Sequence, residues 1–350
     1  MAIIVTGGAG FIGSNFIIDL LENTQEKVIN LDLLTYAGNP KNLSSFEDNK
    51  NYKFFHGDIS DSSLVNKILK TYEPEAIINF AAESHVDRSI HEPSGFIQTN
   101  IVGTFNLLEC VREHLSHLSE NERLKFRFLH VSTDEVFGSA SPSGPAFNEK
   151  TRYKPNSPYS ASKASSDFLV RAYNRTYDMP TIITNCSNNY GPYQFPEKFI
   201  PLTILRAIEG KAIPIYGDGQ QIRDWLYVTD HCDALNRVLK KGLPGDVYNI
   251  GGLNQITNIQ LAENICEILD EVHPSNQSYK SQITFTKDRL GHDRRYAIDC
   301  NKINRELEWM PSESFETGIR KTVSWYLENK EWTDNIIGGA YRAWIKKNYL

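Results

Sequence analysis

Tyr159 and Lys163 are the first residues whose types and spacing suggest chemistry. Side chains four positions apart share a face of an α-helix, so this phenol and this ammonium would project together. Ser157 and Pro158 are typical of a helix N-cap and first turn, and they predict a helix that begins here. A nearby positive charge lowers the pKa of a tyrosine, which can then take a proton from a hydroxyl while hydride leaves the same carbon. A Tyr-x-x-x-Lys pair is common by chance, so this hypothesis depends on the rest of the chain.

Two adjacent acids, Asp134 and Glu135, follow Ser132 and Thr133 just beyond an apolar run over 126–131. Ligands of open α/β sheets bind outside the carboxyl ends of the strands, which is where this segment would lie. Neighbouring carboxyl groups in a water-poor pocket can hold opposite protonation states, so that one donates a proton and the other removes one. The alternative is an ordinary solvated turn in which Asp134 caps a helix.

Glycines are concentrated near the start of the chain, where Gly8-x-Gly10-x-x-Gly13 overlaps Gly7-x-x-Gly10-x-x-Gly13. This loop follows an apolar run over 2–6 and precedes a helical pattern, which is the context that gives the motif its value. Glycines here permit a tight turn and a close approach of backbone N–H groups to a pyrophosphate, whose charge the helix N-terminus stabilises. The loop predicts a dinucleotide site rather than a merely flexible turn.

Asp32 ends the second apolar run of the chain. A carboxylate at this place accepts hydrogen bonds from an adenosine ribose and repels a 2′-phosphate. It therefore favours NAD over NADP, and the alternative is a surface aspartate in a loop. The charge of an oxidised nicotinamide would add to that of Lys163 in stabilising a phenolate at Tyr159.

Short apolar runs alternate with longer amphipathic stretches in the first half of the chain. Strands are expected over residues 2–6, 27–31, 52–56, 76–80, 126–131, 181–186 and 246–251. Helices are expected over 11–22, 62–71, 93–113, 158–177, 227–241 and 258–271, the last of them capped by Thr257. Continuous apolar strands that alternate with helices indicate a parallel sheet covered on both faces. The expected fold class is α/β, a doubly wound parallel Rossmann sheet with a smaller interleaved α/β substrate domain.

The length of 350 residues is enough for about two domains. We expect residues 1–186 and about 223–252 to form the NAD-binding domain, and about 187–222 and 253–350 to form the second domain. Hydrophobic residues make up 40% and charged residues 23%, which argues against disorder. The net charge of −6 lowers the expectation of a nucleic-acid partner. No run reaches the 18 apolar residues that would predict a membrane helix.

Five cysteines, an odd number with no Cys-x-x-Cys spacing, fit unpaired thiols in a reducing cytoplasm. The first residues carry no pattern of a secretory signal, which agrees with a cytoplasmic location. His231 and Cys232 have no companion ligands nearby in the sequence, so we expect no metal site.

The glycine loop and the Tyr-x-x-x-Lys pair together resemble the extended short-chain dehydrogenase/reductases, the NAD-dependent epimerase/dehydratase family. Within this family, the chain is similar to the nucleotide-sugar 4,6-dehydratases over almost its whole length. The segments that carry this similarity are 34–39, 57–59, 81–89, 133–138, 188–193, 196–198, 216–219, 223–225, 291–293 and 339–344. The chain departs from the family pattern at Leu33, where lysine is frequent, at Phe137, where tyrosine is usual, and at Leu290, where proline is usual. None of the three is a proton-transfer group.

The resemblance implies an NAD-dependent dehydration of dTDP-glucose to dTDP-4-keto-6-deoxy-glucose. Tyr159 would take the proton from the sugar O4 as hydride leaves C4. Glu135 would then remove the C5 proton while a protonated Asp134 donates to the departing C6 hydroxyl. Hydride would return to C6, so the cofactor would be regenerated in each turnover.

The resemblance also assigns roles to individual residues. The implied catalytic residues are Thr133, Asp134, Glu135, Tyr159 and Lys163. NAD would be bound by Gly7, Gly10, Phe11, Ile12, Gly13, Asp32, Leu33, Leu34, Thr35, Asp58, Ile59, Ala81, Ala82, Ser84, Thr99, Tyr159, Lys163 and Asn189. The sugar nucleotide would be bound by Ser84, Thr133, Asn188, Glu197, Lys198, Phe199, Pro214, Ile215, Tyr216, Arg223, Asn258, Asp288, Arg289 and His292. No role falls to His85, His91 or His231.

A homodimer formed by helices 93–113 and 158–177 is also implied by the resemblance. Two other functions stay open. A UDP-hexose 4-epimerase would share the fold, the cofactor and the Tyr-x-x-x-Lys pair but would not need Asp134 and Glu135. A non-catalytic NAD-binding scaffold would need none of these groups. The sequence leaves the choice between thymidine and uridine nucleotides open.

Overall fold

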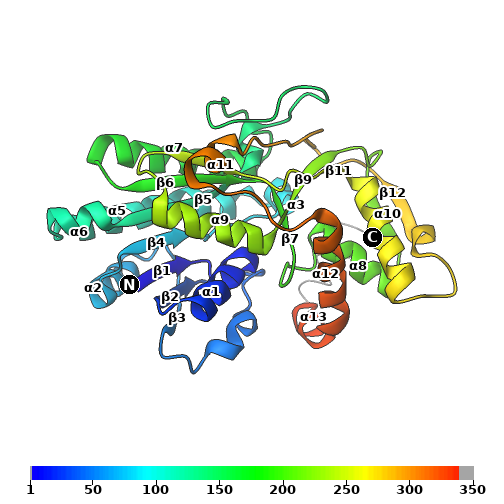
Figure 1. Ribbon diagram of the computed structural model, residues 1–350, viewed down its shortest axis with the longest axis horizontal. Coiled ribbons are helices and arrows are strands. Elements are labelled where there is room, and N and C mark those ends of the chain that lie inside the picture. The colour runs from blue at the N-terminus through cyan, green and yellow to red at the C-terminus, as the bar shows by residue number, and fades with distance from the viewer. Residues whose placement is uncertain (1, 339–350) are drawn as a thin grey trace.

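The computed structural model describes residues 2–338, and a parallel sheet of seven strands forms its centre (Figure 1). The strands are β1 (Ala2–Thr6), β2 (Lys27–Asp32), β3 (Tyr52–His56), β4 (Ala76–Asn79), β5 (Arg127–Thr133), β6 (Thr181–Cys186) and β10 (Val247–Ile250). Their order is β10-β6-β5-β4-β1-β2-β3. All seven were predicted from the sequence, and the doubly wound α/β fold class is confirmed. Because the order reverses between β1 and β4, their carboxyl ends open a crevice for a ligand.

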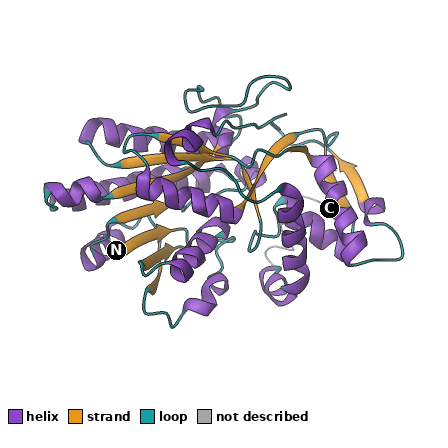
Figure 2. Cartoon of the chain, in the orientation of Figure 1, coloured by secondary structure: helices purple, strands orange, loops and turns teal. Residues whose placement is uncertain are grey.

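Helices cover both faces of this sheet (Figure 2). Ile3 and Val5 of β1 pack into one hydrophobic core, and Ile4 between them packs into the core of the opposite face. The covering helices are α1 (Phe11–Asn23) and α9 (Val228–Lys241) on the first face, and α2 (Ser62–Tyr72), α5 (Thr104–Ser116) and α7 (Pro158–Tyr177) on the second. Burial on both faces explains why the strands are continuous apolar runs rather than alternating ones.

The helix expected over 93–113 is interrupted. It consists of α4 (Pro93–Phe96), a π-helical segment η2 (Ile97–Gly103) and α5. Inside η2, the side-chain amide of Asn100 donates to the carbonyl of Glu83 over 3.0 Å and to Oγ of Ser162 over 2.8 Å. These bonds tie the segment to the loop after β4 and to α7. The helical period of the sequence carries no sign of such cross-links.

The start of α7 is as predicted. Ser157 and Ser160 form a reciprocal cap, in which each hydroxyl accepts the other residue's backbone N–H over 3.0 Å, and Pro158 occupies the first turn. Tyr159 and Lys163 consequently lie in the first two turns of α7. This helix packs against β5 and β6, so both side chains point toward the carboxyl ends of these strands.

A second region contains two small sheets and its own hydrophobic core. One sheet is formed by β7 (Asn188–Tyr190), β9 (Ile222–Tyr227) and β11 (Gln255–Thr257), and the other by β8 (Ile213–Tyr216) and β12 (Ile283–Thr286). Its helices are α8 (Phe199–Ile208), α10 (Asn258–Val272) and α12 (Phe315–Glu328). The sequence predicted α10 and its Thr257 cap but none of these strands. β9, which was expected in the NAD-binding domain, pairs with β7 and β11 and not with the large sheet. The division of the chain into two domains stays a prediction.

The remaining short elements connect these layers. They are helices α3 (Val86–His91), α6 (Glu120–Lys125), α11 (Asn301–Leu307) and α13 (Lys330–Ile336), and the 3-10 turns η1 (Pro40–Phe46), η3 (Asp134–Phe137) and η4 (Tyr279–Gln282). All five cysteines are buried and unpaired. Over residues 2–338, no helix is long and apolar enough to cross a membrane. The family-like tail at 339–344 lies outside the described residues.

Candidate active site

A cavity of about 390 Å³ runs along the carboxyl ends of the central strands and reaches the second region. The predicted cofactor residues that line it are Gly7, Gly10, Phe11, Ile12, Gly13, Asp32, Leu33, Thr35, Asp58, Ile59, Ala81, Ala82, Ser84, Thr99, Tyr159, Lys163 and Asn189. The predicted substrate residues that line it are Ser84, Thr133, Asn188, Glu197, Lys198, Phe199, Pro214, Tyr216, Arg223, Asn258, Arg289 and His292. Glu135 lines it as well, whereas Leu34, Asp134, Ile215 and Asp288 do not.

Strand geometry explains why Ile215 lies elsewhere. Successive side chains of a strand point to opposite faces. Pro214 and Tyr216 of β8 face the cavity, so Ile215 between them points into the hydrophobic core of the second region. It was predicted as a substrate contact and is a core residue.

The glycine loop packs directly against the backbone that follows β4. A Cβ atom on Gly7, whose φ is +69°, would lie 2.6 Å from the backbone nitrogen of Ala81. A Cβ atom on Gly13 would lie 2.4 Å from the carbonyl oxygen of Gly7. Side chains are excluded at both positions, and the first turn of α1 therefore reaches the cavity with its backbone N–H groups exposed to a ligand.

Asp32 is held at the end of β2 by the backbone. Its Oδ2 accepts the N–H of Ala9 over 2.9 Å, and its Oδ1 accepts the N–H of Leu34 over 2.7 Å. Burial raises the pKa of Asp32, and the two hydrogen bonds oppose that rise. Each oxygen keeps a lone pair for another donor. Leu34 thus contributes its N–H to the carboxylate and no side chain to the cavity.

Tyr159 and Lys163 are buried side by side in the cavity wall. Nζ of Lys163 donates to the carbonyl oxygen of Val131 over 2.9 Å. Burial, and then the negative charge of Glu135, raise the pKa of Tyr159 well above its usual value, while a hydrogen bond with Thr133 lowers it. Desolvation therefore dominates in the protein alone, and the expected lowering by Lys163 together with the cofactor charge stays a prediction.

Asp134 lies outside the cavity wall, at the start of η3. Only 1% of its surface is exposed, and its Oδ2 has no hydrogen-bond partner among residues 2–338. Burial raises the pKa of Asp134 well above its usual value, and the adjacent Glu135 raises it further. These effects favour a neutral carboxylic acid that can donate a proton.

Glu135 faces the cavity and a smaller polar recess of about 60 Å³ beside it. Its backbone N–H donates to Oγ1 of Thr133 over 3.2 Å. Burial raises the pKa of Glu135, while the positive charges of Lys198, Arg223 and Arg289 lower it. Three facing cations favour the ionised form at Glu135. Burial outweighs these charges, so the pKa of Glu135 is raised on balance, and the expected contrast between the two acids stays a prediction.

Arg223 of β9 is held by its backbone surroundings. Its Nη1 donates to the carbonyl of Ile222 over 2.8 Å, and its Nη2 donates to the carbonyl of Asp293 over 3.0 Å. The guanidinium carbon lies 4.2 Å from the ring centre of Tyr296. A fixed, planar guanidinium of this kind suits phosphate oxygens.

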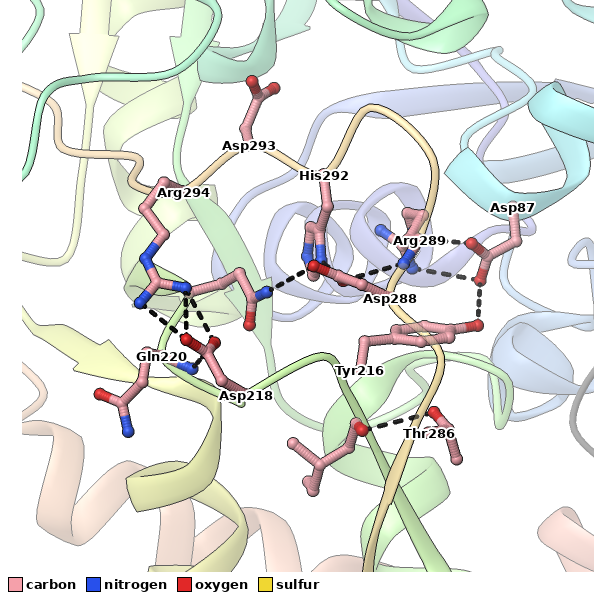
Figure 3. Close-up of polar contacts among 12 residues, drawn as sticks. Asp87, Tyr216, Asp218, Gln220, Thr286, Asp288, Arg289, His292, Asp293 and Arg294 are labelled. Carbon is pink, nitrogen blue, oxygen red and sulfur yellow. Dashed lines mark hydrogen bonds and ion pairs between the residues drawn. The ribbon is translucent and has the colours of Figure 1, made fainter.

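The loop that follows β12 closes one side of the cavity (Figure 3). Nε of Arg289 lies 2.6 Å from Oδ1 of Asp87 in α3, and Tyr216 donates its hydroxyl to the same carboxylate over 3.3 Å. Nδ1 of His292 lies 2.7 Å from Oδ1 of Asp288. Asp288, predicted as a substrate contact, therefore positions His292 from outside the cavity.

Glu197 lines the cavity, but its carboxylate is engaged within the wall. Arg88 donates to it from Nε over 3.1 Å and from Nη2 over 2.9 Å. The guanidinium of Arg88 lies 3.8 Å from the ring centre of Tyr36. The neighbouring Lys198 donates to the carbonyl of Ser84 over 2.8 Å. This ion pair supports the wall between the two halves of the site.

Two histidines without a predicted role contact residues of this site. His231 is fully buried, and its Nδ1 lies 2.8 Å from Oδ1 of Asn189, which can only accept, so His231 donates. His85 lines the cavity, and its Nε2 lies 3.9 Å from the carboxylate of Glu197. His85 lies in the family-like segment 81–89, but no local pattern predicts either contact, since the partners are distant in the chain.

The model of the family described as GDP-mannose 4,6 dehydratase matches residues 4–322. The chain belongs to this family. The resemblance to nucleotide-sugar dehydratases is thereby confirmed. The chain is 56% identical to a dTDP-glucose 4,6-dehydratase from Salmonella typhimurium over all of this chain and 99% of the relative. The dTDP-glucose 4,6-dehydratase 1 from Escherichia coli K12 is also 56% identical, with the same coverage.

Solved structures of family members and of related epimerases have the same fold. The dTDP-glucose 4,6-dehydratase from Streptomyces venezuelae with NAD and TYD bound is 44% identical, with a TM-score of 0.88, and covers 96% of this chain and 100% of its own. A UDP-glucose 4-epimerase from Thermotoga maritima with UDP-glucose is 30% identical, with a TM-score of 0.82, and covers 94% of this chain and 100% of its own. Fold alone therefore does not separate dehydratases from epimerases.

None of the three departures from the family pattern is itself a proton-transfer group. Leu33 lines the cavity and is 40% exposed. Phe137 is buried and packs its ring against those of Phe147 and Tyr153. Leu290 is exposed on the loop beside Arg289.

Proposed function

We propose that the protein is an NAD-dependent nucleotide-sugar dehydratase that converts dTDP-glucose into dTDP-4-keto-6-deoxy-glucose and water. The observation that carries this proposal is the placement of Glu135 in the same cavity as Tyr159, with the buried Asp134 directly beside it. A 4-epimerase has no use for a second acid and base next to its tyrosine. The high identity to dehydratases over the full chain supports the same choice.

The residues present fit NAD. The cradle formed by Gly7 and Gly13 would be filled by any Cβ atom, and the open N-terminus of α1 faces it. Asp32 lies at the end of β2, where an adenosine ribose would meet it. When bound, NAD accepts a hydride from the sugar and returns it. Thr99, Asn189 and the other lining residues named above would complete the site.

Tyr159 begins the proposed reaction by taking the proton of the sugar O4 while C4 is oxidised. Burial keeps Tyr159 protonated in the protein alone, so the positive charges of Lys163 and of the oxidised cofactor would have to favour its phenolate. Thr133 shares a hydrogen bond with Tyr159 and would hold O4 in place. The ketone at C4 makes the C5 hydrogen acidic.

Glu135 then removes the C5 proton, and Asp134 protonates the departing C6 hydroxyl, so the C5–C6 double bond forms as water leaves. Because Asp134 lies outside the cavity wall, its proton has to pass the short distance to the wall through a small side-chain movement or a bound water. Hydride returns to C6 and a proton to C5. Arg223, Arg289 and Lys198 would hold the diphosphate, while Pro214 and Tyr216 would contact the base.

The proposed assembly is a homodimer. The chain exposes large apolar side chains on η2, α5 and α7, namely Ile97, Val102, Phe105, Phe168 and Tyr177. Since α5 and α7 lie against one another, these side chains would meet a second copy as a bundle of helices. A cytoplasmic location stays a prediction from the cysteines.

Turnover with defined substrates tests the function. The purified protein is incubated with dTDP-glucose, UDP-glucose and GDP-mannose, and products are followed by absorbance of the 4-keto sugar and by NMR. We expect a 4-keto-6-deoxy product, formed fastest from dTDP-glucose. Interconversion of UDP-glucose and UDP-galactose without loss of water would instead assign an epimerase.

A further inference from the structure

Asp167 continues the helical face that carries Tyr159 and Lys163. The three residues are spaced four apart on α7, and all are buried against β5 and β6. A buried carboxylate that lies outside the cavity has no part in the reaction proposed above. Its surroundings show what it does for the other two residues.

Three donors converge on one oxygen of Asp167. Oδ2 accepts from Oγ of Ser132 over 2.9 Å, from the hydroxyl of Tyr153 over 2.9 Å and from the side-chain amide of Asn185 over 3.3 Å. Hydrogen bonds from three donors stabilise the ionised form of a carboxylate. Three hydrogen-bond donors therefore orient the Asp167 carboxylate behind the active-site wall.

The other oxygen, Oδ1, faces His130. Oδ1 lies 3.5 Å from Nε2 of His130. The amide of Asn79 lies 3.1 Å from Nδ1 of His130, and the Oδ1 atom of Asn79 already accepts from Thr6 over 2.6 Å. The Asn79 amide must therefore donate to Nδ1, which leaves the ring proton of a neutral His130 on Nε2.

This tautomer prevents His130 from accepting a hydrogen bond from Lys163, although the two nitrogens are only 3.5 Å apart. Burial lowers the pKa of His130 to about 4, so the ring carries no charge near neutral pH. Burial also raises the pKa of the facing Cys186 thiol to about 12. Tyr159, on the same helix, is protonated in the protein alone.

Of the groups that face Lys163, His130 and Cys186 are neutral near pH 7, whereas Asp167 is a carboxylate one turn along the same helical face. Burial lowers the pKa of Lys163, and the charge of Asp167 opposes this. We propose that Asp167 is the positioning residue of the Tyr159–Lys163 pair, whose buried carboxylate keeps Lys163 protonated. A neutral lysine could not favour a phenolate at Tyr159.

The same carboxylate also fixes the strand end that carries the acids. Ser132 precedes Thr133 in β5, and the amide of Asn185 donates both to Asp167 and to the carbonyl of Thr133 over 3.2 Å. Asp167 therefore links the lysine turn of α7 to the end of β5. This inference rests on the proposed roles of Tyr159 and Lys163, so its test includes a measurement that needs no turnover.

Asp167→Asn removes the charge and keeps the size of the side chain. Lysine labelled with ¹³C at Cε reports each ammonium by NMR in the protein without substrate, and Lys163→Met identifies the signal of Lys163. We expect Asp167→Asn to lower the proton affinity of Lys163 about tenfold or more, because the buried ammonium loses an opposite charge on the same helical face. Asp167→Glu, which keeps the charge, should retain most of the proton affinity of Lys163.

Asp230→Asn is a matched control. Asp230 is also buried and also accepts three hydrogen bonds, from the backbone and hydroxyl of Ser312 and the backbone of Glu313, but it lies at the start of α9. We expect Asp230→Asn to leave the pH at which Lys163 titrates unchanged, even if the variant is less stable. An unchanged Lys163 signal in Asp167→Asn would overturn the inference.

Turnover gives the second readout. The acid limb of the kcat/KM profile should move to higher pH in Asp167→Asn, because the variant's Lys163 loses its proton more readily and a neutral Lys163 no longer favours the Tyr159 phenolate. In a Lys163→Met background, the same substitution should leave the limb unmoved. An equal loss of kcat/KM in the parent and in the Lys163→Met background would show that Asp167 has only a structural role. If the parent chain does not dehydrate dTDP-glucose at all, the proposed function fails while the lysine titration still decides this inference.

Discussion

Arg289 and Asp87 form an ion pair between the loop after β12 and helix α3. Nε of Arg289 lies 2.6 Å from Oδ1 of Asp87, and Nη2 donates to Oδ2 over 3.1 Å. Arg289 also lines the cavity. Asp87 therefore fixes the direction of the Arg289 guanidinium at the cavity wall.

Asp87→Asn should weaken substrate binding more than chemistry. We expect KM for dTDP-glucose to rise about tenfold, or about 1.4 kcal/mol, with kcat changed much less. Steady-state kinetics measure both. Asp218→Asn is the control, since the pair between Arg294 of this loop and Asp218 of the turn after β8 is exposed and such pairs contribute little. Equal effects of the two variants would argue against a positioning role for Asp87.

Asp32 should determine the choice of cofactor. Its carboxylate is fixed by two backbone N–H groups and would repel a 2′-phosphate in a partly desolvated site. We expect at least about a tenfold preference for NAD over NADP, or about 1.4 kcal/mol. Reconstitution of the cofactor-free protein with each nucleotide measures it. Comparable activity with NADP would refute this role.

The sequence predicted the central sheet because most of its strands are buried on both faces and carry their own apolar signal, and edge strand β3, although only partly buried, is rich in aromatic residues. It missed β8 and β12, whose four-residue strands pair with each other although they are far apart in the chain. The glycine loop, Asp32, Tyr159 and Lys163 were found because their roles depend on local spacing. His231, Asp87 and Asp167 act through partners on other elements, and no local pattern marks such contacts.

Tyr159→Phe should stop the first step and spare the fold. Loss of a general base costs about 100-fold or more in turnover. The ring packs edge-on against that of Phe96, a contact that phenylalanine keeps. We expect an unchanged melting temperature and little reduction of bound NAD on addition of dTDP-glucose. Turnover close to that of the parent would place the base elsewhere.

His231 should make stability depend on pH. Burial lowers its pKa to about 3 in the folded protein, below the value of about 6.5 in the unfolded chain. Its contribution is therefore complete above about pH 6.5 and is lost as the pH falls toward 3, at up to about 1.4 kcal/mol per pH unit. Urea unfolding between pH 7 and pH 4 should give a shallower loss for His231→Gln, whose amide can still donate to Asn189. Parallel curves for the two proteins would contradict this.

Glu135→Gln separates a dehydratase from an epimerase. Glutamine keeps the shape of the side chain but cannot remove the C5 proton, which becomes acidic only after C4 is oxidised. Loss of a general base costs about 100- to 10,000-fold. Bound NAD should therefore still be reduced when dTDP-glucose is added, while loss of water and entry of solvent deuterium at C5 nearly stop.

Asp134→Asn is the companion variant, because it removes the proposed donor and leaves the base in place. We expect it to slow departure of the C6 hydroxyl while exchange of the C5 proton persists. Deuterium entry measured by mass spectrometry and formation of the 4-keto-6-deoxy product together resolve the two steps. If Glu135→Gln dehydrates dTDP-glucose at close to the parent rate, the two carboxyl groups are ordinary turn residues, and the epimerase function gains support.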